Sequence, residues 1–162
     1  MPYNLNIVLV EPQIPANTGS IGRICVATET VLHLIEPMGF EVSDAQVKRA
    51  GLDYWQYLAV HCHKNLRSFL DSIPNDAPKV FFSTKAGRSY FEHRFEAGSY
   101  LFFGSETAGL PEEVFASFPD RIFRIPLYDL RVRSLNLANS VSIVVYEAIR
   151  QLEKTPGSSN RL

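Results

Sequence analysis

The stretch Leu5–Val10, which reads LNIVLV, decides the fold class because it is an apolar and β-branched run. Such a run is typical of a strand buried on both faces, as in a parallel sheet. Comparable runs recur along the chain and are separated by turn residues. The further predicted strands are Val31–Ile35, Tyr57–Cys62, Lys79–Ser83, Tyr100–Phe103 and Arg121–Ile125.

Helical patterns separate these strands. Asn17 is predicted to cap a helix over Gly19–Thr28, and the longest helix is predicted over Leu137–Leu152, with its apolar side chains on one stripe. Shorter helices are expected at Ser43–Ala50, Asn65–Ser72 and Pro111–Phe118, and a loop with one helical turn at Lys85–Gly98. Because strands alternate with helices, we expect an α/β fold with a parallel sheet flanked by helices on both faces.

Length and composition set further limits. The 162 residues predict one domain over 1–153, followed by a polar, flexible tail at 154–162. The net charge of −1 argues against a general polyanion-binding protein, although a local basic patch would still attract RNA. Two isolated cysteines predict a reducing, cytoplasmic location. The beginning, MPYNLNIVLVEPQ, lacks the pattern of a secretory signal, and no apolar run reaches the ~20 residues of a membrane span.

The segment Glu11–Arg23 is the first candidate for a site because it follows a strand and opens a helix. Open α/β sheets bind ligands at such points. Arg23 lies off the apolar stripe of its helix, so its guanidinium can point into a cleft and bind phosphate. The alternative is a tight strand-to-helix turn with a surface arginine.

Two later segments resemble opposite walls of a pocket for a polar small molecule. In Phe103–Pro111, Gly104 ends an apolar run and Glu106 stands alone in the turn that follows. In Ile125–Ser140, Arg131, Arg133 and Ser134 precede the longest helix, and Asn136 and Asn139 fall in its first turn. Backbone amides and side-chain oxygens gather there, and an arginine-rich loop beside a helix N-terminus attracts phosphate. The alternative for Glu106 is a capped turn. For the second segment it is a capped helix, but capping needs only one residue and this segment supplies four: Ser134, Asn136, Asn139 and Ser140.

Other motifs give weaker signals. His61 and His63 would share one face of a strand, but no further ligands follow at a metal-site spacing, so we expect a surface strand end and no metal. Trp55 is expected in the core or at a subunit interface, with base stacking as the alternative. Neither a phosphate loop nor a dinucleotide fingerprint follows any strand.

In this order, the three segments resemble the SPOUT-class (trefoil-knotted) methyltransferases. The chain is most similar to the compact bacterial enzymes that methylate the ribose 2′-hydroxyl of the wobble nucleotide, position 34, in tRNA. The resemblance covers Asn6 to about Leu152. It is carried by these residues: Glu11-Pro12, Ile14-Pro15, Asn17-Thr18-Gly19, Arg23, Ile35 to Phe40, Arg49 to Tyr54, Ser83-Thr84-Lys85, Phe103 to Glu106, Gly109-Leu110-Pro111, Arg124-Ile125-Pro126, Arg133 to Leu137 and Val144 to Ala148.

The resemblance implies a C-terminal trefoil knot, an exception to the rule that chains do not knot. It implies that S-adenosylmethionine is the cofactor and lies bent in the knot. The residues implied to bind it are Phe82, Ser83, Gly104, Ile125, Leu127, Ser134 and Leu135. Arg23 would touch the target phosphate and help to deprotonate the ribose hydroxyl. Asn17, Glu106, Ser134 and Asn136 would orient Arg23 and the substrate, the anticodon stem-loop of tRNA. The compact enzymes are homodimers in which each site borrows residues from the partner.

Two departures accompany the resemblance. Ala27–Thr30 lacks an expected glycine before the second strand, and Tyr128–Val132 is one residue longer than in the nearest relatives and carries the extra Arg131. The alternatives are a ribose methyltransferase for another tRNA or rRNA position, and a non-catalytic RNA- or nucleotide-binding module on the same fold. A third alternative is a plain doubly wound nucleotide-binding protein, but the sequence lacks the phosphate-loop motif that such a protein would carry.

Overall fold

A seven-stranded sheet forms the centre of the computed structural model, which describes residues 3–42, 54–129 and 131–153. Every strand pair in it is parallel, and the strand order is β3-β2-β1-β6-β4-β7-β5. The strands are β1 (Asn6–Val10), β2 (Val31–Ile35), β3 (Val60–His63), β4 (Lys79–Phe82), β5 (Arg88–Ser89), β6 (Tyr100–Phe103) and β7 (Ile122–Arg124). The predicted parallel sheet is therefore confirmed.

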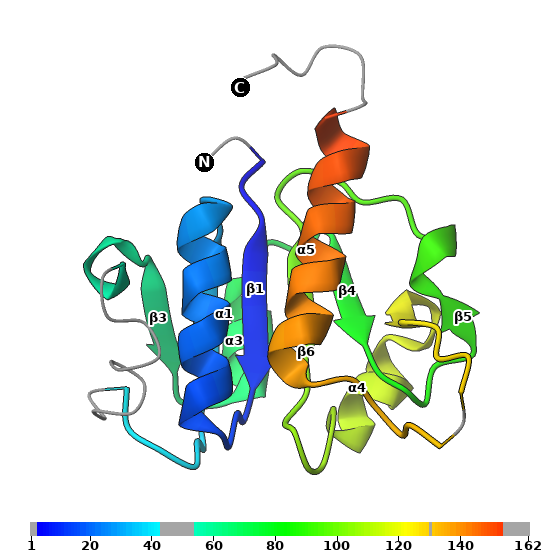
Figure 1. Ribbon diagram of the computed structural model, residues 1–162, viewed down its shortest axis with the longest axis horizontal. Helices are drawn as coiled ribbons and strands as arrows, with labels where there is room; N and C mark the ends of the chain where they lie inside the picture. Colours follow the sequence, from blue (N-terminus) through cyan, green and yellow to red (C-terminus); the bar gives the residue numbers. More distant parts are fainter. Residues whose placement is uncertain (1–2, 43–53, 130, 154–162) are drawn as a thin grey trace.

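Helices cover both faces of this sheet. Helices α1 (Pro15–Ala27) and α5 (Leu137–Glu153) lie side by side on one face, in front of the strands in Figure 1. Helices α3 (Leu66–Ser72) and α4 (Glu112–Ser117) contribute Phe69 and Val114 to the core on the other face. The short 3-10 turns are Trp55–Tyr57, Tyr90–Glu92 and Pro119–Arg121. None of the described helices combines the length and the apolar character needed to cross a bilayer.

The side chains of the central strands explain this layering. Along β1, Ile7 and Leu9 point into the core under α1 and α5, whereas Val8 and Val10 point into the opposite core. All four side chains are at most 1% exposed. Because alternate residues of a strand face opposite sides, a strand that is apolar throughout must be covered on both.

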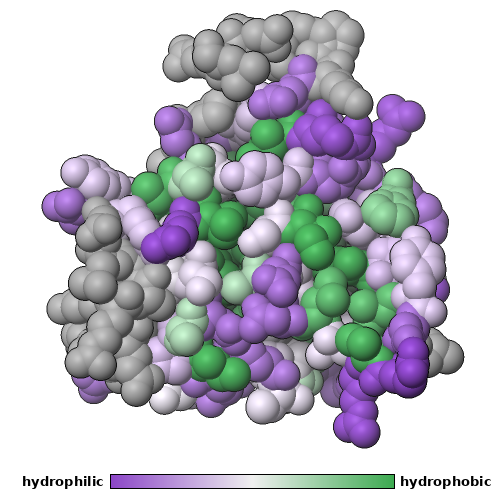
Figure 2. Space-filling model, viewed as in Figure 1, coloured by the Kyte–Doolittle hydropathy of each residue, from purple (hydrophilic) through white to green (hydrophobic). Residues whose placement is uncertain are grey.

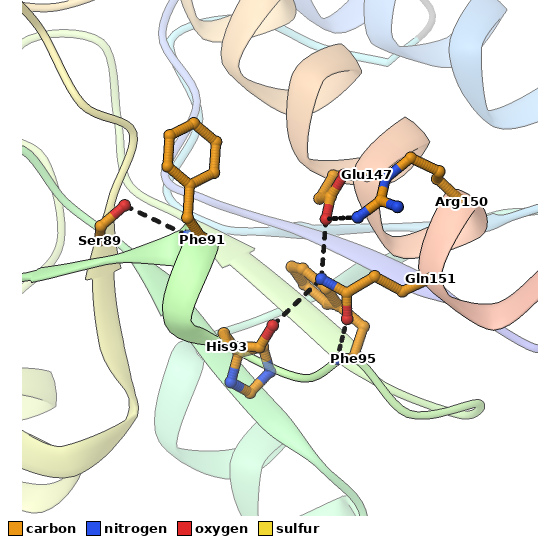
Figure 3. A network of polar contacts seen from close by, with 7 residues as sticks. All are labelled: Ser89, Phe91, His93, Phe95, Glu147, Arg150 and Gln151. Carbon is orange, nitrogen blue, oxygen red and sulfur yellow. Dashed lines mark hydrogen bonds and ion pairs between the residues drawn. The ribbon is translucent and has the colours of Figure 1, made fainter. Parts of the chain in front are cut away.

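The carboxyl end of α5 is fastened to the chain that precedes β6 (Figure 3). Gln151 accepts a hydrogen bond from the Phe95 amide (3.0 Å) and donates one to the His93 carbonyl (3.1 Å). The same amide group donates to Glu147, which also pairs with Arg150 at 2.7 Å. This polar network holds the last turns of the longest helix against residues 93–95, which follow the 3-10 turn Tyr90–Glu92.

Four expectations need correction or fall outside the described residues. Asn17 does not cap α1, because the helix begins at Pro15 with Ile14 as its N-cap residue. Proline suits the first turn, where its missing N–H is not needed. The stretch Lys85–Gly98 contains the short edge strand β5 in addition to a helical turn. The predicted helix at Ser43–Ala50 and the tail at 154–162 lie outside the described residues.

Candidate functional site

A cavity of about 640 Å³ opens at the carboxyl ends of β4 and β6. It lies between the turn after β6 and the segment that enters α5. This is the edge at which open α/β sheets bind ligands. The lining residues are Ile14, Asn17, Phe82 to Lys85, Phe103 to Leu110, Phe115, Ile125, Leu127, Arg133 to Leu137 and Ser140. The two segments predicted to face each other across a pocket therefore do so.

All seven residues expected to bind the cofactor line this cavity: Phe82, Ser83, Gly104, Ile125, Leu127, Ser134 and Leu135. Of the residues expected to orient the substrate, Asn17, Glu106, Ser134 and Asn136 line it as well. The chain thus brings together side chains that lie more than a hundred residues apart in sequence, such as Asn17 and Asn136.

Glu106 joins the turn after β6 to the beginning of α1. Its Oε2 accepts a hydrogen bond from the Gln13 amide (2.8 Å), and its Oε1 accepts from the Ile14 amide (3.1 Å) and from Asn17 Nδ2 (3.1 Å). The first amides of a helix lack partners within the helix and attract a carboxylate. The N-cap residue of α1 makes no side-chain hydrogen bond, so Glu106, from another part of the chain, caps this end of the helix.

Asn17 connects Glu106 to the beginning of α5. Its Oδ1 accepts a hydrogen bond from Asn136 Nδ2 (2.9 Å). Asn136 Oδ1 in turn accepts from the amides of Ala138 (2.9 Å) and Asn139 (3.3 Å), so it caps α5. The carboxylate of Glu106 and the two asparagines therefore form one chain of hydrogen bonds along the cavity wall. We refer to Glu106, Asn17 and Asn136 as the cavity network.

The backbone around the network requires two glycines. Ser105 and Gly109 form an antiparallel bridge that closes the turn carrying Glu106. A side chain at Gly104 would bring its Cβ within 2.0 Å of the Gly109 carbonyl carbon, and Gly109 has a φ of +72°. Both positions therefore require glycine: a Cβ at position 104 would clash with the backbone, and the φ of position 109 disfavours other residues. The tight turn is what allows Glu106 to reach α1.

Arg23 stands apart from the cavity. Its side chain is exposed on α1, its guanidinium carbon lies 4.6 Å from the centre of the Tyr54 ring, and it is not one of the cavity-lining residues. The structure thus joins four of the five residues expected to act in catalysis, and leaves the arginine outside the cavity of its own chain.

Two cationic residues at the cavity were not among the residues expected to act in catalysis or to bind the cofactor. Lys85 and Arg133 both line it, and Lys85 Nζ lies 3.3 Å from Glu112 Oε1 at the rim. Both stand in segments that carry the resemblance, so the signal was present in the sequence. Their exposed positions were not predictable from spacing.

The histidines of β3 lie at the far edge of the sheet. His33 packs against both His61 and His63, with ring centres 5.5 and 5.2 Å away, and His33 Nδ1 lies 3.0 Å from His63 Nε2. Burial, followed by the two neighbouring imidazoles, lowers the pKa of His33 to about 4. Within the described part of the chain, no three His, Cys, Asp or Glu side chains are grouped so that they could hold a metal ion.

Comparison with known proteins assigns the chain to a family. The SpoU rRNA Methylase family matches residues 4–146. A tRNA (cytidine(34)-2′-O)-methyltransferase of Escherichia coli strain K12 is 46% identical over 151 residues, which are 91% of this chain and 94% of that protein. The enzyme of the same name from Burkholderia cenocepacia strain HI2424 is 44% identical over 148 residues, or 90% and 94% of the two chains.

Solved structures agree with the sequence relatives. One described as "Structural insights into the 2-OH methylation of C/U34 on tRNA" superimposes with a TM-score of 0.89 at 45% identity, over 94% of this chain and 98% of that one. The SpoU methyltransferase AviRb from Streptomyces viridochromogenes superimposes with a TM-score of 0.80 at 25% identity, over 91% of this chain and 59% of that one. On the match of nearly its whole length, this chain belongs to the SpoU rRNA Methylase family.

Proposed function

We propose that this protein transfers a methyl group from S-adenosylmethionine to the ribose 2′-hydroxyl of nucleotide 34 in the anticodon loop of tRNA. The observation that carries the proposal is the cavity network, which joins three distant segments at one cavity lined by all the residues expected to bind the cofactor. Relatives about 45% identical over nearly their whole length carry names with this activity, which supports it.

The cavity suits S-adenosylmethionine in size and chemistry. Its volume lies within the ~300–1,000 Å³ of small-molecule sites. Phe82, Leu127 and Leu135 offer apolar surface to a purine ring, whereas Ser83 offers a polar group to the charged end. When bound, this cofactor supplies an electrophilic methyl group on a sulfonium. The trefoil knot expected around it stays a prediction.

The residues of the chain would act by positioning and by deprotonation. A methyl transfer needs the oxygen nucleophile in line with the methyl group, and correct placement contributes much of the rate. Ser134 and Asn136 stand at the cavity, where they can hold the ribose. The carboxylate of Glu106 fixes Asn17, which in turn fixes the amide orientation of Asn136. The 2′-hydroxyl must lose its proton as its oxygen bonds to the methyl group, and Arg23 is the residue proposed to assist that loss.

We further propose a homodimer in which Arg23 of the partner subunit completes the cavity. Two observations support it. Arg23 lies outside the cavity of its own chain, and the face formed by α1 and α5 carries exposed Ile143 and Tyr146, at 37% and 53%. Figure 2 shows hydrophobic side chains along the middle of this face. Apolar area of this kind commonly marks a subunit contact.

The activity is tested by mapping ribose methylation in tRNA from cells with and without this gene. We expect the 2′-O-methyl group at position 34 to disappear when the gene is deleted, and purified protein to restore it. A transcript with 2′-deoxyribose at position 34 should accept no methyl group. Loss of methylation at another nucleotide would contradict the assigned position, and unchanged methylation would contradict the activity.

The shared site is tested by mixing two inactive variants. Arg23→Ala and Ser134→Ala should each abolish turnover. In a mixed dimer, one cavity would combine an intact Ser134 with an intact Arg23 from the other subunit, so activity should return. Arginine acting within its own chain would leave both cavities defective and the mixture inactive.

The protein is expected in the cytoplasm, in keeping with Cys25 and Cys62, which are both free thiols.

A further inference from the structure

The segment between β7 and α5 leaves the cavity wall and returns to it. Leu127 lines the cavity on one side of this segment and Arg133 on the other. The residues between them, of which Tyr128, Asp129, Arg131 and Val132 are described, therefore form part of the cavity rim. We call Tyr128, Asp129 and Arg131 to Arg133 the rim loop.

An internal ion pair shapes the rim loop. Asp129 Oδ1 accepts hydrogen bonds from the Arg131 amide and from Arg131 Nε, both at 3.0 Å. Its Oδ2 accepts from Arg131 Nη2 at 2.6 Å, and the Val132 amide donates to the Asp129 carbonyl at 3.1 Å. These contacts close a turn, and the Asp129 carboxylate neutralises the charge of Arg131. The guanidinium accordingly lowers the pKa of Asp129.

The turn holds a large aromatic ring out in solvent. Tyr128 is 90% exposed, more than any other large hydrophobic side chain of the described chain, and Val132 is 47% exposed. Phe91, on the neighbouring 3-10 turn, is 62% exposed and lies 4.7 Å from the Tyr90 ring. A flat, exposed ring with few rotamers loses little entropy when a second ring stacks on it.

Positive charge gathers along the same segment. Residues 121–133 contain four arginines and one aspartate, a local excess of three positive charges, whereas the whole chain has a net charge of −1. Arg124 and Arg133 are exposed, and neither forms an ion pair with another described residue. A surface that combines an aromatic platform with unpaired arginines matches single-stranded RNA, in which bases stack and phosphates pair with cations.

We propose that Tyr128 is a stacking platform for an unpaired RNA base next to the methylated nucleotide, with Arg124 and Arg133 holding the adjoining phosphates. The inference rests on the proposed function, because it concerns the RNA of that reaction. It assigns substrate recognition to the rim loop, beside the cavity. A second copy of this chain would fit this surface less well than RNA. If it docked through the same segment, like charges would face each other, and if it docked through another surface, Arg124 and Arg133 would gain no phosphate partners.

The first experiment separates flatness from mere bulk at position 128. Tyr128→Phe and Tyr128→Trp should keep kcat/KM for tRNA within about twofold of the original protein. Tyr128→Ala and Tyr128→Leu should lower it roughly ten- to hundredfold, mainly through KM, as expected for loss of one stacked base. Tyr57→Ala is the matched control, because Tyr57 is 72% exposed at the opposite end of the sheet. A leucine variant equal to the original protein would overturn the stacking role.

The second experiment locates the base. An abasic site on the 3′ or the 5′ side of nucleotide 34 should cause the same loss as Tyr128→Ala, with little further loss when both changes are combined. Arg133→Gln should reduce the salt dependence of KM, whereas Tyr128→Ala should leave that slope unchanged. A change in oligomeric state of Tyr128→Ala in the ultracentrifuge would identify the rim loop as a subunit contact and overturn the proposal.

Failure of this inference is distinguishable from failure of the proposed function. If the original protein methylates position 34 and all Tyr128 variants match it, only the stacking role is wrong. If the original protein methylates no tRNA at position 34, the proposed function itself is wrong. Binding of S-adenosylmethionine should be the same in all variants, because Tyr128 lies outside the cavity lining.

Discussion

The two ends of α5 carry polar networks of similar size but different purpose. At the amino end, Asn136 caps the helix and joins Asn17 in the cavity network. At the carboxyl end, Gln151 joins the helix to the backbone of His93 and Phe95 (Figure 3). The first network lines the cavity, whereas the residues of the second do not.

This difference separates activity from stability along one helix. The amino end must place side chains at a cavity that stays open to ligands, so each of its hydrogen bonds has a positioning role. The carboxyl end satisfies the backbone groups of His93 and Phe95, and leaving these groups without a partner would weaken the fold. Substitutions at the two ends should therefore affect different measurements.

The largest effect is expected at Glu106. Glu106→Gln replaces one acceptor oxygen by a donor that faces another donor, either the Gln13 amide or the Ile14 amide with Asn17. We expect kcat/KM to fall about a hundredfold, which corresponds to ~2.7 kcal/mol. Steady-state kinetics with tRNA would measure it, with the exposed Glu113→Gln as control. An activity within threefold of the original would show that the carboxylate charge is unnecessary for positioning.

A smaller loss is expected at Asn136. Asn136→Ala removes the cap of α5 and the bond to Asn17, so kcat/KM should fall at least tenfold and the free energy of unfolding by ~1 kcal/mol. Asn139→Ala is the matched control, because Asn139 contributes only a backbone amide to the cap. Urea unfolding and kinetics together measure both effects. Equal behaviour of the two variants would remove Asn136 from the network.

The carboxyl end should show the opposite pattern. Gln151→Ala leaves the Phe95 amide and the His93 carbonyl without this partner, and we expect the free energy of unfolding to fall by about 1–2 kcal/mol. The kcat/KM of the folded protein should stay within twofold of the original. Gln151→Glu keeps an acceptor for the Phe95 amide but places a second carboxylate beside Glu147. Its free energy of unfolding should therefore lie between those of the original protein and Gln151→Ala. A tenfold loss of activity would mean that the two ends are coupled through α5.

Acid should weaken the fold through His33. Because burial lowers the pKa of His33 to about 4, the unfolded chain binds a proton there between pH 6.5 and 4 and the folded chain does not. Stability is therefore full above pH 6.5 and falls as the pH drops, by ~1 kcal/mol between pH 7 and pH 5.5 from this group. His33→Gln should flatten that part of the unfolding profile measured in urea. An unchanged slope would assign the acid sensitivity to other groups, such as His63 and His93, whose pKa values are also lowered by burial.

The sequence predicted the central strands well because they are apolar throughout, whereas the strand predicted at Tyr57–Cys62 is observed as β3 at Val60–His63, after a 3-10 turn. Val31–Ile35 and Tyr100–Phe103 were placed at their observed bounds. The short strand β5 was missed because Arg88 and Ser89 form an edge strand with no apolar pattern. Asn17 was misplaced as a cap because the same residue type serves caps and sites equally well, and only the position of Pro15 in the helix distinguishes them.

The sequence by itself determined the parallel α/β architecture, because the apolar periodicity of strands and helices is a local property of the chain. Its short motifs, through the resemblance that they carry, also indicated the family and part of the cavity lining. Only the tertiary structure decided that Glu106 caps α1, that Asn17 links it to Asn136, and that Arg23 lies outside the cavity of its own chain. Hydrogen bonds between residues some ninety positions or more apart depend on how strands order themselves in the sheet. That order is set by packing across the whole core, so no single segment encodes it.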